Sequence, residues 1–254
     1  MNALKVAHRN ALVYRKIWRG GIFFSFLTPL LFLAAMGIGV GSLVPRDSPE
    51  LQGFTYLQFF ASGMLAAVCM QAGSFEASFP IMAKIAWQRN YEAMMATPLR
   101  VRDLVGGEMI WFGFRLTMIS AAFYGVMFIF DVPVGRTSFL AIPTGVLTGL
   151  GFAAAVMSYS ATQKDAASFN GLFRFVISPL FLFTGAFFPI ERLPLILRAI
   201  VYITPSYHGV RLSRGYVLGT MTPAEATLHW AALIAFFLIA ATAAFVLLSR
   251  RLIK

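Results

Sequence analysis

The sequence predicts an all-α, polytopic integral membrane protein with six transmembrane helices. It also predicts an N-terminal interfacial amphipathic helix and external re-entrant or interfacial helices before the last span. Of the 254 residues, 59% are hydrophobic and 12% are charged. With a mean hydropathy of +0.75, that much apolar surface does not fit into a soluble core. The cations lie in short clusters between long apolar runs, which is typical of orientation in a membrane and argues against nucleic-acid binding.

Residues 1–20 are expected to form an amphipathic helix at the membrane surface. Five cations lie in this stretch, and its apolar residues repeat at roughly helical spacing: Leu4, Ala7, Ala11, Tyr14 and Trp18. Such a stripe can rest on lipid headgroups or pack on a neighbouring subunit, and the spacing leaves both open. The apolar run that follows is too long for a signal peptide and has no A-x-A site, so we expect it to be retained.

Six apolar runs follow, each long enough to cross a hydrocarbon core of about 30 Å. The predicted spans are residues 22–44, 54–75, 108–130, 137–159, 171–190 and 228–248. Glycines indicate close helix packing in the first span and close packing or flexibility in the fourth, whereas Pro179 and Gly185 suggest that the fifth is bent. Arg115 lies about two turns beyond Glu108, and we expect it to reach the interface or a carboxylate, because a centred arginine is costly in a bilayer.

The cations also predict the orientation of the chain. With six spans both termini lie on one side, where thirteen Lys and Arg fall, against six on the other side. Both termini and the polar stretch Glu76–Gly107 are therefore expected to be cytoplasmic, and Glu191–Thr227 external. The external segment contains LPLILRAIVYITP, which is too short to span and predicts a pair of short interfacial or re-entrant helices.

The stretch Glu76–Gly107 is the one long polar interruption between apolar runs, and we expect it to contact a partner. Asn90 can cap a short helix, and Glu92 suits the positive end of that helix. Pro98 forces Thr97 out of helical geometry and so ends it.

One face of this short helix is expected to project into a groove on the partner. Its apolar residues are spaced i, i+3 and i+4: Tyr91, Met94 and Met95. A helix of this length is not stable alone. Three cations flank it, with charge suited to an acidic or phosphate-bearing partner: Arg89, Arg100 and Arg102. The alternative is a solvated loop whose cations lie at the membrane surface.

Motifs for catalysis or cofactor binding are missing from the sequence. His8, His208 and His229 are too scattered to suggest a metal site, and neither H-E-x-x-H nor C-x-x-C occurs. There is no G-x-x-x-x-G-K-[ST] loop, so ATP must be hydrolysed by another subunit. We expect no metal and no cofactor in this chain. The external acids, which a membrane-embedded enzyme would need close together, are scattered: Asp47, Glu50, Asp131, Glu191 and Glu225.

Four blocks of the sequence resemble the permease subunits of ABC-2 type exporters, and most closely the NodJ-like lipo-oligosaccharide group. They are YLQFFASGM at 56–64, SFEASFPIMAKIAWQRNYEAMMATPLRVRDLVGGEM at 74–109, FLFTGAFFPIERLP at 181–194 and PSYHGVRLSRGYVLG at 205–219. Together with the spacing of the spans, these blocks cover nearly the whole chain. The resemblance implies an ABC-2 type transmembrane domain over residues 22–251 in a bacterial cytoplasmic (inner) membrane, preceded by the cytoplasmic helix over residues 1–21.

The resemblance also implies partners and site residues. Two copies of an ATP-binding subunit would hold ATP–Mg, and a second permease copy would complete a homodimer. The second block would couple to the ATP-binding subunit through Arg89, Asn90, Tyr91, Glu92, Met94, Met95, Thr97, Pro98, Leu99 and Arg100. The last two blocks would form helices near the exit, with the exit segment made by Phe187, Phe188, Pro189, Leu193, Pro194, Leu195 and Ile196.

The function expected from these points is a permease subunit that moves an amphipathic substrate out of the cytoplasm. The resemblance suggests a lipo-oligosaccharide or a lipid-linked glycan. Alternatives are a permease for drugs or hydrophobic compounds, a membrane-embedded enzyme that modifies lipid or glycan, and a passive channel or assembly scaffold.

Overall fold

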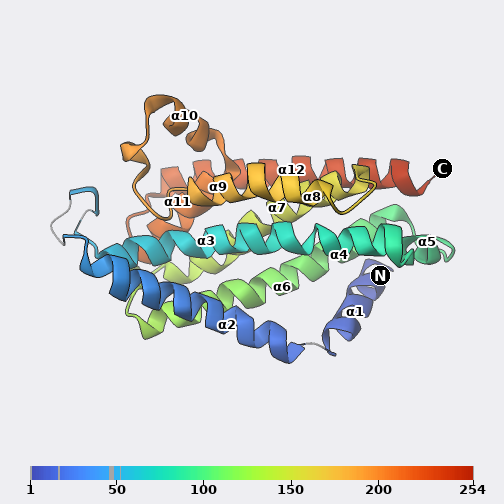
Figure 1. Ribbon diagram of the computed structural model, residues 1–254, viewed down its shortest axis with the longest axis horizontal. Coiled ribbons are helices and arrows are strands. Elements are labelled where there is room, and N and C mark those ends of the chain that lie inside the picture. Colours follow the sequence, from blue (N-terminus) through green and yellow to red (C-terminus); the bar gives the residue numbers. More distant parts are fainter. Residues whose placement is uncertain (1, 17, 46–48, 52, 254) are drawn as a thin grey trace.

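A computed structural model describes residues 2–16, 18–45, 49–51 and 53–253, and every regular element among them is a helix. The all-α prediction is therefore confirmed for the described part of the chain. The long helices run side by side along one axis of the molecule (Figure 1). Arg46 and Asp47, which the sequence places in the first polar turn, lie outside the described residues.

Four described helical stretches are long and apolar enough to cross a membrane by length and composition. They are Trp18–Ser42, Val101–Ile129, Ser138–Thr162 and Pro223–Leu252. They contain most of the first, third, fourth and sixth predicted spans, although three of them begin or end well outside the predicted limits.

These four stretches are built from regular helices and short irregular turns. The first is α2 (Trp18–Ala34) followed by a π-helical and a 3-10 turn, and the third is a 3-10 turn followed by α7 (Ala141–Thr162). The others are α6 (Val101–Ile129) and α12 (Pro223–Leu252). Because α6 begins at Val101, Glu108 lies two turns inside a helix and not at its start.

The second predicted span corresponds to α3 (Tyr56–Glu76), which lies against α6, α7 and α11 (Pro205–Leu218). Thr55 begins it: the Thr55 hydroxyl accepts from the Gln58 backbone N–H at 3.2 Å, and the Gln58 side chain accepts from the Thr55 N–H at 3.0 Å. Its 21 residues extend about 31 Å. Its length suits a span, but it is not among the four stretches that combine length with apolarity.

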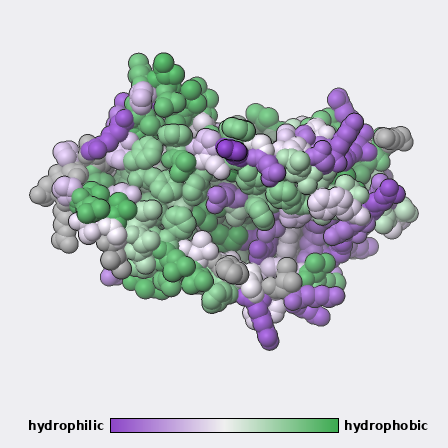
Figure 2. Space-filling view, in the orientation of Figure 1, coloured by the Kyte–Doolittle hydropathy of each residue, from purple (hydrophilic) through white to green (hydrophobic). Residues whose placement is uncertain are grey.

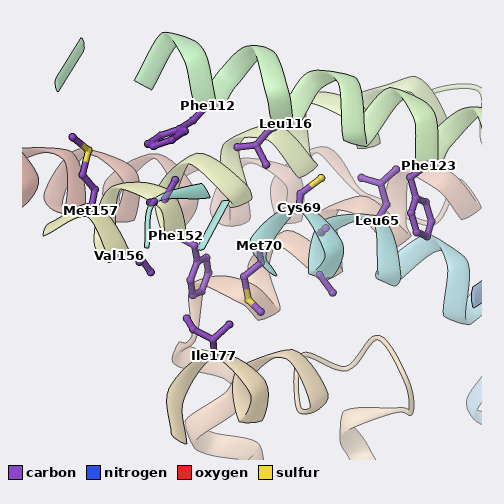
Figure 3. Packing of buried hydrophobic residues seen from close by; sticks show 14 of the residues in the cluster. Leu65, Cys69, Met70, Phe112, Leu116, Phe123, Phe152, Val156, Met157 and Ile177 are labelled. Carbon is purple, nitrogen blue, oxygen red and sulfur yellow. The ribbon is translucent and has the colours of Figure 1, made fainter. Parts of the chain in front are cut away.

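The core lies where α3, α6 and α7 meet. Cys69 of α3 faces Leu116 of α6 there, Leu65 of α3 lies beside Phe123 of α6, and Phe152 of α7 lies beside Met70 of α3 (Figure 3). Glycine lets α3 and α7 approach closely, because a Cβ on Gly73 would collide with the carbonyl oxygen of Gly149. The close packing predicted for the fourth span is confirmed at this crossing.

The fifth predicted span is wrong at its C-terminal end. The apolar helix covers only Ser168–Leu182, as α8 (Ser168–Leu172), a π-helical turn and α9 (Ser178–Leu182). Beyond it, Gly185 has φ +82°, and its carbonyl accepts a hydrogen bond from Arg214 of α11 at 2.7 Å. A continued helix would place Pro189, which has no N–H, opposite the Gly185 carbonyl, and Arg214 of α11 supplies the donor that this carbonyl needs.

The apolar stripe predicted for the N-terminal helix is only partly used for packing within the chain, and its expected contact with lipid headgroups or a neighbouring subunit stays a prediction. In α1 (Asn2–Tyr14) the buried residues are Val6, Ala7 and Asn10, whereas Leu4 and Ala11 are exposed. Val6 packs on Gly107 of α6, where an added Cβ would lie 2.5 Å from the Val6 Cβ. The helix packs on α6 of its own chain because glycine leaves room for it there.

The two ends of the bundle differ in chemistry. Both termini and α5 (Asn90–Met95) lie at one end, where hydrophilic side chains gather, and apolar surface covers the middle and the other end (Figures 1 and 2). At that other end α10 (Leu195–Ile203) stands out from the bundle while α11 is packed inside it. The two helices too short to span are present as predicted, and their interfacial or re-entrant placement stays a prediction.

Candidate coupling site

The polar stretch between α3 and α6 folds into a chain of short helices. α4 (Phe79–Met82) continues into a π-helical turn over Ala83–Trp87, and α5 follows at the end of the molecule. Arg89 precedes α5 in the left-handed conformation, with φ 49° and ψ 28°. This left-handed residue changes the direction of the chain between the π-helical turn and α5.

The capping role predicted for Asn90 is wrong. Asn90 is the first helical residue of α5, and its side-chain amide donates to the Gln88 side chain at 2.5 Å. The left-handed Arg89 occupies the cap position without a side-chain hydrogen bond. The prediction for Glu92 is confirmed, since it lies in the first turn of α5. Its negative charge there interacts favourably with the positive end of the helix dipole.

The prediction that Tyr91 projects from the surface is wrong, because its side chain is 0% exposed. Its hydroxyl donates to Oε1 of Glu108, seventeen residues further on in α6, at 3.0 Å. A polar contact inside the bundle therefore turns the helix face that carries Tyr91 inwards. Met94 and Met95, on the same face, are half-buried against the core.

Glu108 is the centre of a buried polar cluster that joins four elements, which we call the Glu108 cluster. Its carboxylate accepts from Nζ of Lys84 at 2.7 Å on both oxygens, from Tyr91, and from Nδ2 of Asn10 in α1 at 3.0 Å. The Glu108 side chain is fully buried and that of Lys84 is 14% exposed. A buried carboxylate is stable only with such donors.

The Glu108 cluster also fixes the protonation of Tyr91. Burial, and next the negative charge of Glu108, raise the pKa of Tyr91 well above its usual value of 10.0. The phenol therefore keeps its proton and acts as a donor at physiological pH. Through these hydrogen bonds the cluster connects α5 to α6 and to α1.

The rest of the predicted coupling segment is open at the surface. Of the predicted residues, Arg89, Glu92, Thr97, Pro98 and Arg100 are exposed, and Asn90 and Leu99 are half-buried. Ala93 and Ala96, which lie between them, are also exposed. Trp87 was missed by sequence reasoning, although it is 64% exposed beside this segment. The signal was present: a large aromatic residue followed by Gln88 and Arg89 in a polar stretch is a typical interface anchor. A docking role for this surface stays a prediction.

Arg115 forms an ion pair with a carboxylate, which was one of the two expectations for this residue. The partner is Glu76 at the end of α3, whose Oε1 lies 3.1 Å from both Nε and Nη2 of Arg115. The guanidinium also lies over the ring of Tyr14 in α1, with Cζ 4.3 Å from the ring centre. A second polar contact between α1 and the bundle therefore lies beside the Glu108 cluster.

The predicted exit segment divides into two groups at the opposite end. Phe187 packs on Phe60 of α3, with ring centres 5.5 Å apart, and its carbonyl accepts from the Tyr56 hydroxyl at 3.2 Å. Phe188, Pro189 and Leu193 are half-buried. By contrast Pro194 is exposed, and Leu195 and Ile196 are 81% and 77% exposed. A role for these residues at an exit stays a prediction.

The histidines are less scattered than the sequence suggested. His208 of α11 and His229 of α12 lie with their Nδ1 atoms 2.8 Å apart, and His229 is buried. The two histidines are 21 positions apart in the sequence, and this separation hides their proximity from spacing arguments. Among the described residues, no group of three or more possible ligands could hold a metal ion.

Comparison with known proteins gives one consistent result. The family model described as ABC-2 type transporter matches residues 4–218. Nodulation protein J of Rhizobium leguminosarum bv. trifolii is 31% identical over 258 residues, which cover 100% of this chain and 95% of that protein. Nodulation protein J of Rhizobium meliloti (strain 1021) is 30% identical over 255 residues, covering 99% and 94%. The inner membrane transport permease YadH of Escherichia coli (strain K12) is 24% identical over 189 residues, covering 71% and 70%.

Proposed function

The chain belongs to the ABC-2 type transporter family, and from that premise we propose that it is the permease of an exporter driven by a separate ATP-binding subunit. It moves an amphipathic substrate out of the cytoplasm, and the sequence blocks favour a lipo-oligosaccharide or a lipid-linked glycan. Two ATP-binding subunits hold ATP–Mg, and two permease copies enclose the path. The similarity to Nodulation protein J over the full chain supports this proposal.

The permease lies in the bacterial cytoplasmic membrane with both termini in the cytoplasm. The majority of the cations on the side of the termini supports this orientation. So does the gathering of hydrophilic side chains at the end that carries α5 and both termini (Figure 2). In this orientation α10 lies outside, and its exposed apolar residues meet lipid or leaving substrate.

The Glu108 cluster is the observation that carries the coupling proposal. An ATP-binding subunit that docks on Trp87 and on the exposed side of α5 would push on a helix that is too short to transmit force by itself. Tyr91 and Glu108 connect α5 to α6, and Asn10 extends the connection to α1. Closure of the ATP-binding subunits therefore moves α6 and α1 together, which changes the side on which the path is open.

Purification from native membranes tests the docking surface. We expect an ATP-binding subunit, identified by mass spectrometry, to copurify with the wild-type chain. Trp87→Ala should weaken its capture by about 2 kcal/mol, as for an interface anchor, and Ala96→Asp should weaken capture further. Ala224→Asp, at an exposed alanine near the opposite end of the molecule, is the matched control and should leave capture unchanged. Equal capture by all four proteins would contradict docking at α5.

The substrate class is tested by export from cells that lack the permease gene. Lipo-oligosaccharide should accumulate inside these cells and appear outside once the wild-type gene is restored. Accumulation of a hydrophobic drug instead would favour the efflux alternative.

A further inference from the structure

Two clefts meet beside the Arg115–Glu76 ion pair. The first has a volume of about 590 Å³ and lies between α1, α6 and the turn after α4. The second, of about 500 Å³, lies between α2, α3 and α6. Four residues line both: Gly21, Phe75, Glu76 and Arg115. The ion pair therefore lies at the junction of the two clefts.

This junction holds both of the described buried side-chain atoms that have no hydrogen-bond partner. They are the Tyr14 hydroxyl and Nη1 of Arg115, and the Arg115 guanidinium lies over the Tyr14 ring at 4.3 Å. Buried polar groups without a partner are rare, and each calls for an explanation such as a bound water or ligand. Both groups can donate a hydrogen bond, so a suitable ligand offers acceptor oxygens.

The charge of the first cleft favours an anion. Among its described lining residues are three cations, Arg9, Lys84 and Arg115, and one carboxylate, Glu76. Lys84 is bound to Glu108 and part of the Arg115 guanidinium to Glu76. Arg9, which donates one hydrogen bond from Nη1 to Oδ1 of Asn10 at 3.4 Å, keeps further donors for a ligand, as does Arg115 with its free Nη1. An arginine with a free nitrogen beside a hydroxyl is well suited to a phosphate group.

The second cleft favours a ligand that also has an apolar part. Its wall includes Val68, Ala72 and Ile119 together with the 57% exposed ring of Phe75. A free phosphate would leave this wall uncovered. A glycerophospholipid places its phosphate at the junction and an acyl chain along the wall, and basic pockets between membrane helices bind anionic lipid headgroups.

We propose that Arg115 and Tyr14 bind the phosphate of an anionic glycerophospholipid from the surrounding leaflet. The site lies between α1 and the bundle, so an occupied site holds α1 against α6 next to the Glu108 cluster. Gly21 keeps the site open to the Tyr14 ring, because a Cβ there would lie 2.5 Å from the Tyr14 hydroxyl.

The test measures lipid retention by the purified full-length chain, without an ATP-binding subunit, after exposure to equimolar phosphatidylglycerol and phosphatidylcholine. Native mass spectrometry should show that phosphatidylglycerol is retained in preference. Tyr14→Phe should lower retention of phosphatidylglycerol about tenfold, since a hydrogen bond to its phosphate is lost. Arg115→Lys keeps the positive charge but loses the guanidinium, which can donate two parallel hydrogen bonds to a phosphate. It should also lower the retention of phosphatidylglycerol. The matched controls are Tyr159→Phe on α7 and the exposed Arg102→Lys on α6, and both should retain the wild-type preference.

Tyr14→Phe separates binding from a structural role, because its hydroxyl has no partner within the protein. In lipid-free detergent its Tm should equal or exceed that of the wild type. Three results would overturn the proposal: equal retention of both lipids by the wild type, unchanged retention of phosphatidylglycerol by Tyr14→Phe, or displacement of phosphatidylglycerol by millimolar glycerol 3-phosphate. The last result would assign the site to a soluble phosphate. Since the assay needs no transport, its failure would leave the exporter proposal intact.

Discussion

Glu108 shows how a single residue can organise a polar stretch in an apolar chain. Its carboxylate accepts hydrogen bonds from Lys84, Tyr91 and Asn10, which belong to three different segments. Each donor would be costly to bury alone. Hydrogen bonds to the Glu108 carboxylate therefore hold the three segments together, in addition to apolar packing.

Substitutions in the Glu108 cluster should destabilise the fold in a definite order. Glu108→Ala leaves the mostly buried Lys84 without its counter-ion and should lower the free energy of unfolding by about 3–5 kcal/mol. Tyr91→Phe removes one donor of several and should lower it by about 1–3 kcal/mol. Thermal unfolding in detergent measures both. Glu92→Ala, at an exposed acid on the same short helix, should change it by less than about 1 kcal/mol. A Tyr91→Phe protein as stable as the wild type would contradict the cluster.

The burial of Tyr91 marks the limit of what spacing alone could predict here. Periodicity correctly groups Tyr91 with Met94 and Met95 on one face of a short helix. It does not say whether that face meets a partner or the same chain. The answer depends on Glu108, which the span prediction placed at the start of an apolar run and not inside a helix. Its contacts with Lys84 and Asn10 join residues up to 98 positions apart.

At the scale of helices, the lengths of apolar runs predict most of the elements. The first, third, fourth and sixth predicted spans each correspond to an apolar helical stretch that is long enough to cross a membrane. The fifth does not: its helix ends at Leu182, and the chain beyond it is bound at Gly185 by Arg214, which is 29 positions away and meets it only in the folded chain. The face of α1 that packs within the chain could not be predicted for a similar reason, since Gly107 of α6 selects that face.

Gly185 should tolerate substitution worse than a glycine in the helix before it. Gly185 has φ +82°, and a Cβ there would lie 2.6 Å from Cδ1 of Ile190. Gly185→Ala should therefore lower the free energy of unfolding by about 1–3 kcal/mol. Gly171, in α8, has open space around it, so Gly171→Ala should be neutral or stabilise by about 0.4–1 kcal/mol. Thermal unfolding of the two variants in the same detergent measures the difference. Equal stability would show that the chain does not turn at Gly185 as described.

At the scale of the whole molecule, the distribution of charge agrees with the arrangement of the helices. The termini and α5 lie at one end, and the loops that the cation count places outside lie at the other (Figure 1). The sequence could predict this because each long apolar run carries the chain from one end of the bundle to the other, whichever neighbours it contacts. Contacts such as the His208–His229 pair depend on how α11 enters the bundle, which no run length reveals.

Cysteine labelling should show which end faces the cytoplasm. Ala96 follows α5 and Thr220 precedes α12, and both side chains are exposed. Ala96→Cys and Thr220→Cys therefore place a reactive thiol at opposite ends of the bundle. The native Cys69 is 0% exposed, so it should remain unlabelled while the chain is folded and can stay in place.

In intact spheroplasts, an impermeant maleimide should label Thr220→Cys and leave Ala96→Cys unlabelled. After the membrane is permeabilised both should react, which confirms that Ala96→Cys is accessible. Labelling of Ala96→Cys from outside would reverse the orientation and separate α5 from any cytoplasmic ATP-binding subunit. The lipid site at Tyr14 and Arg115 would be unaffected, because an anionic lipid can enter from either leaflet.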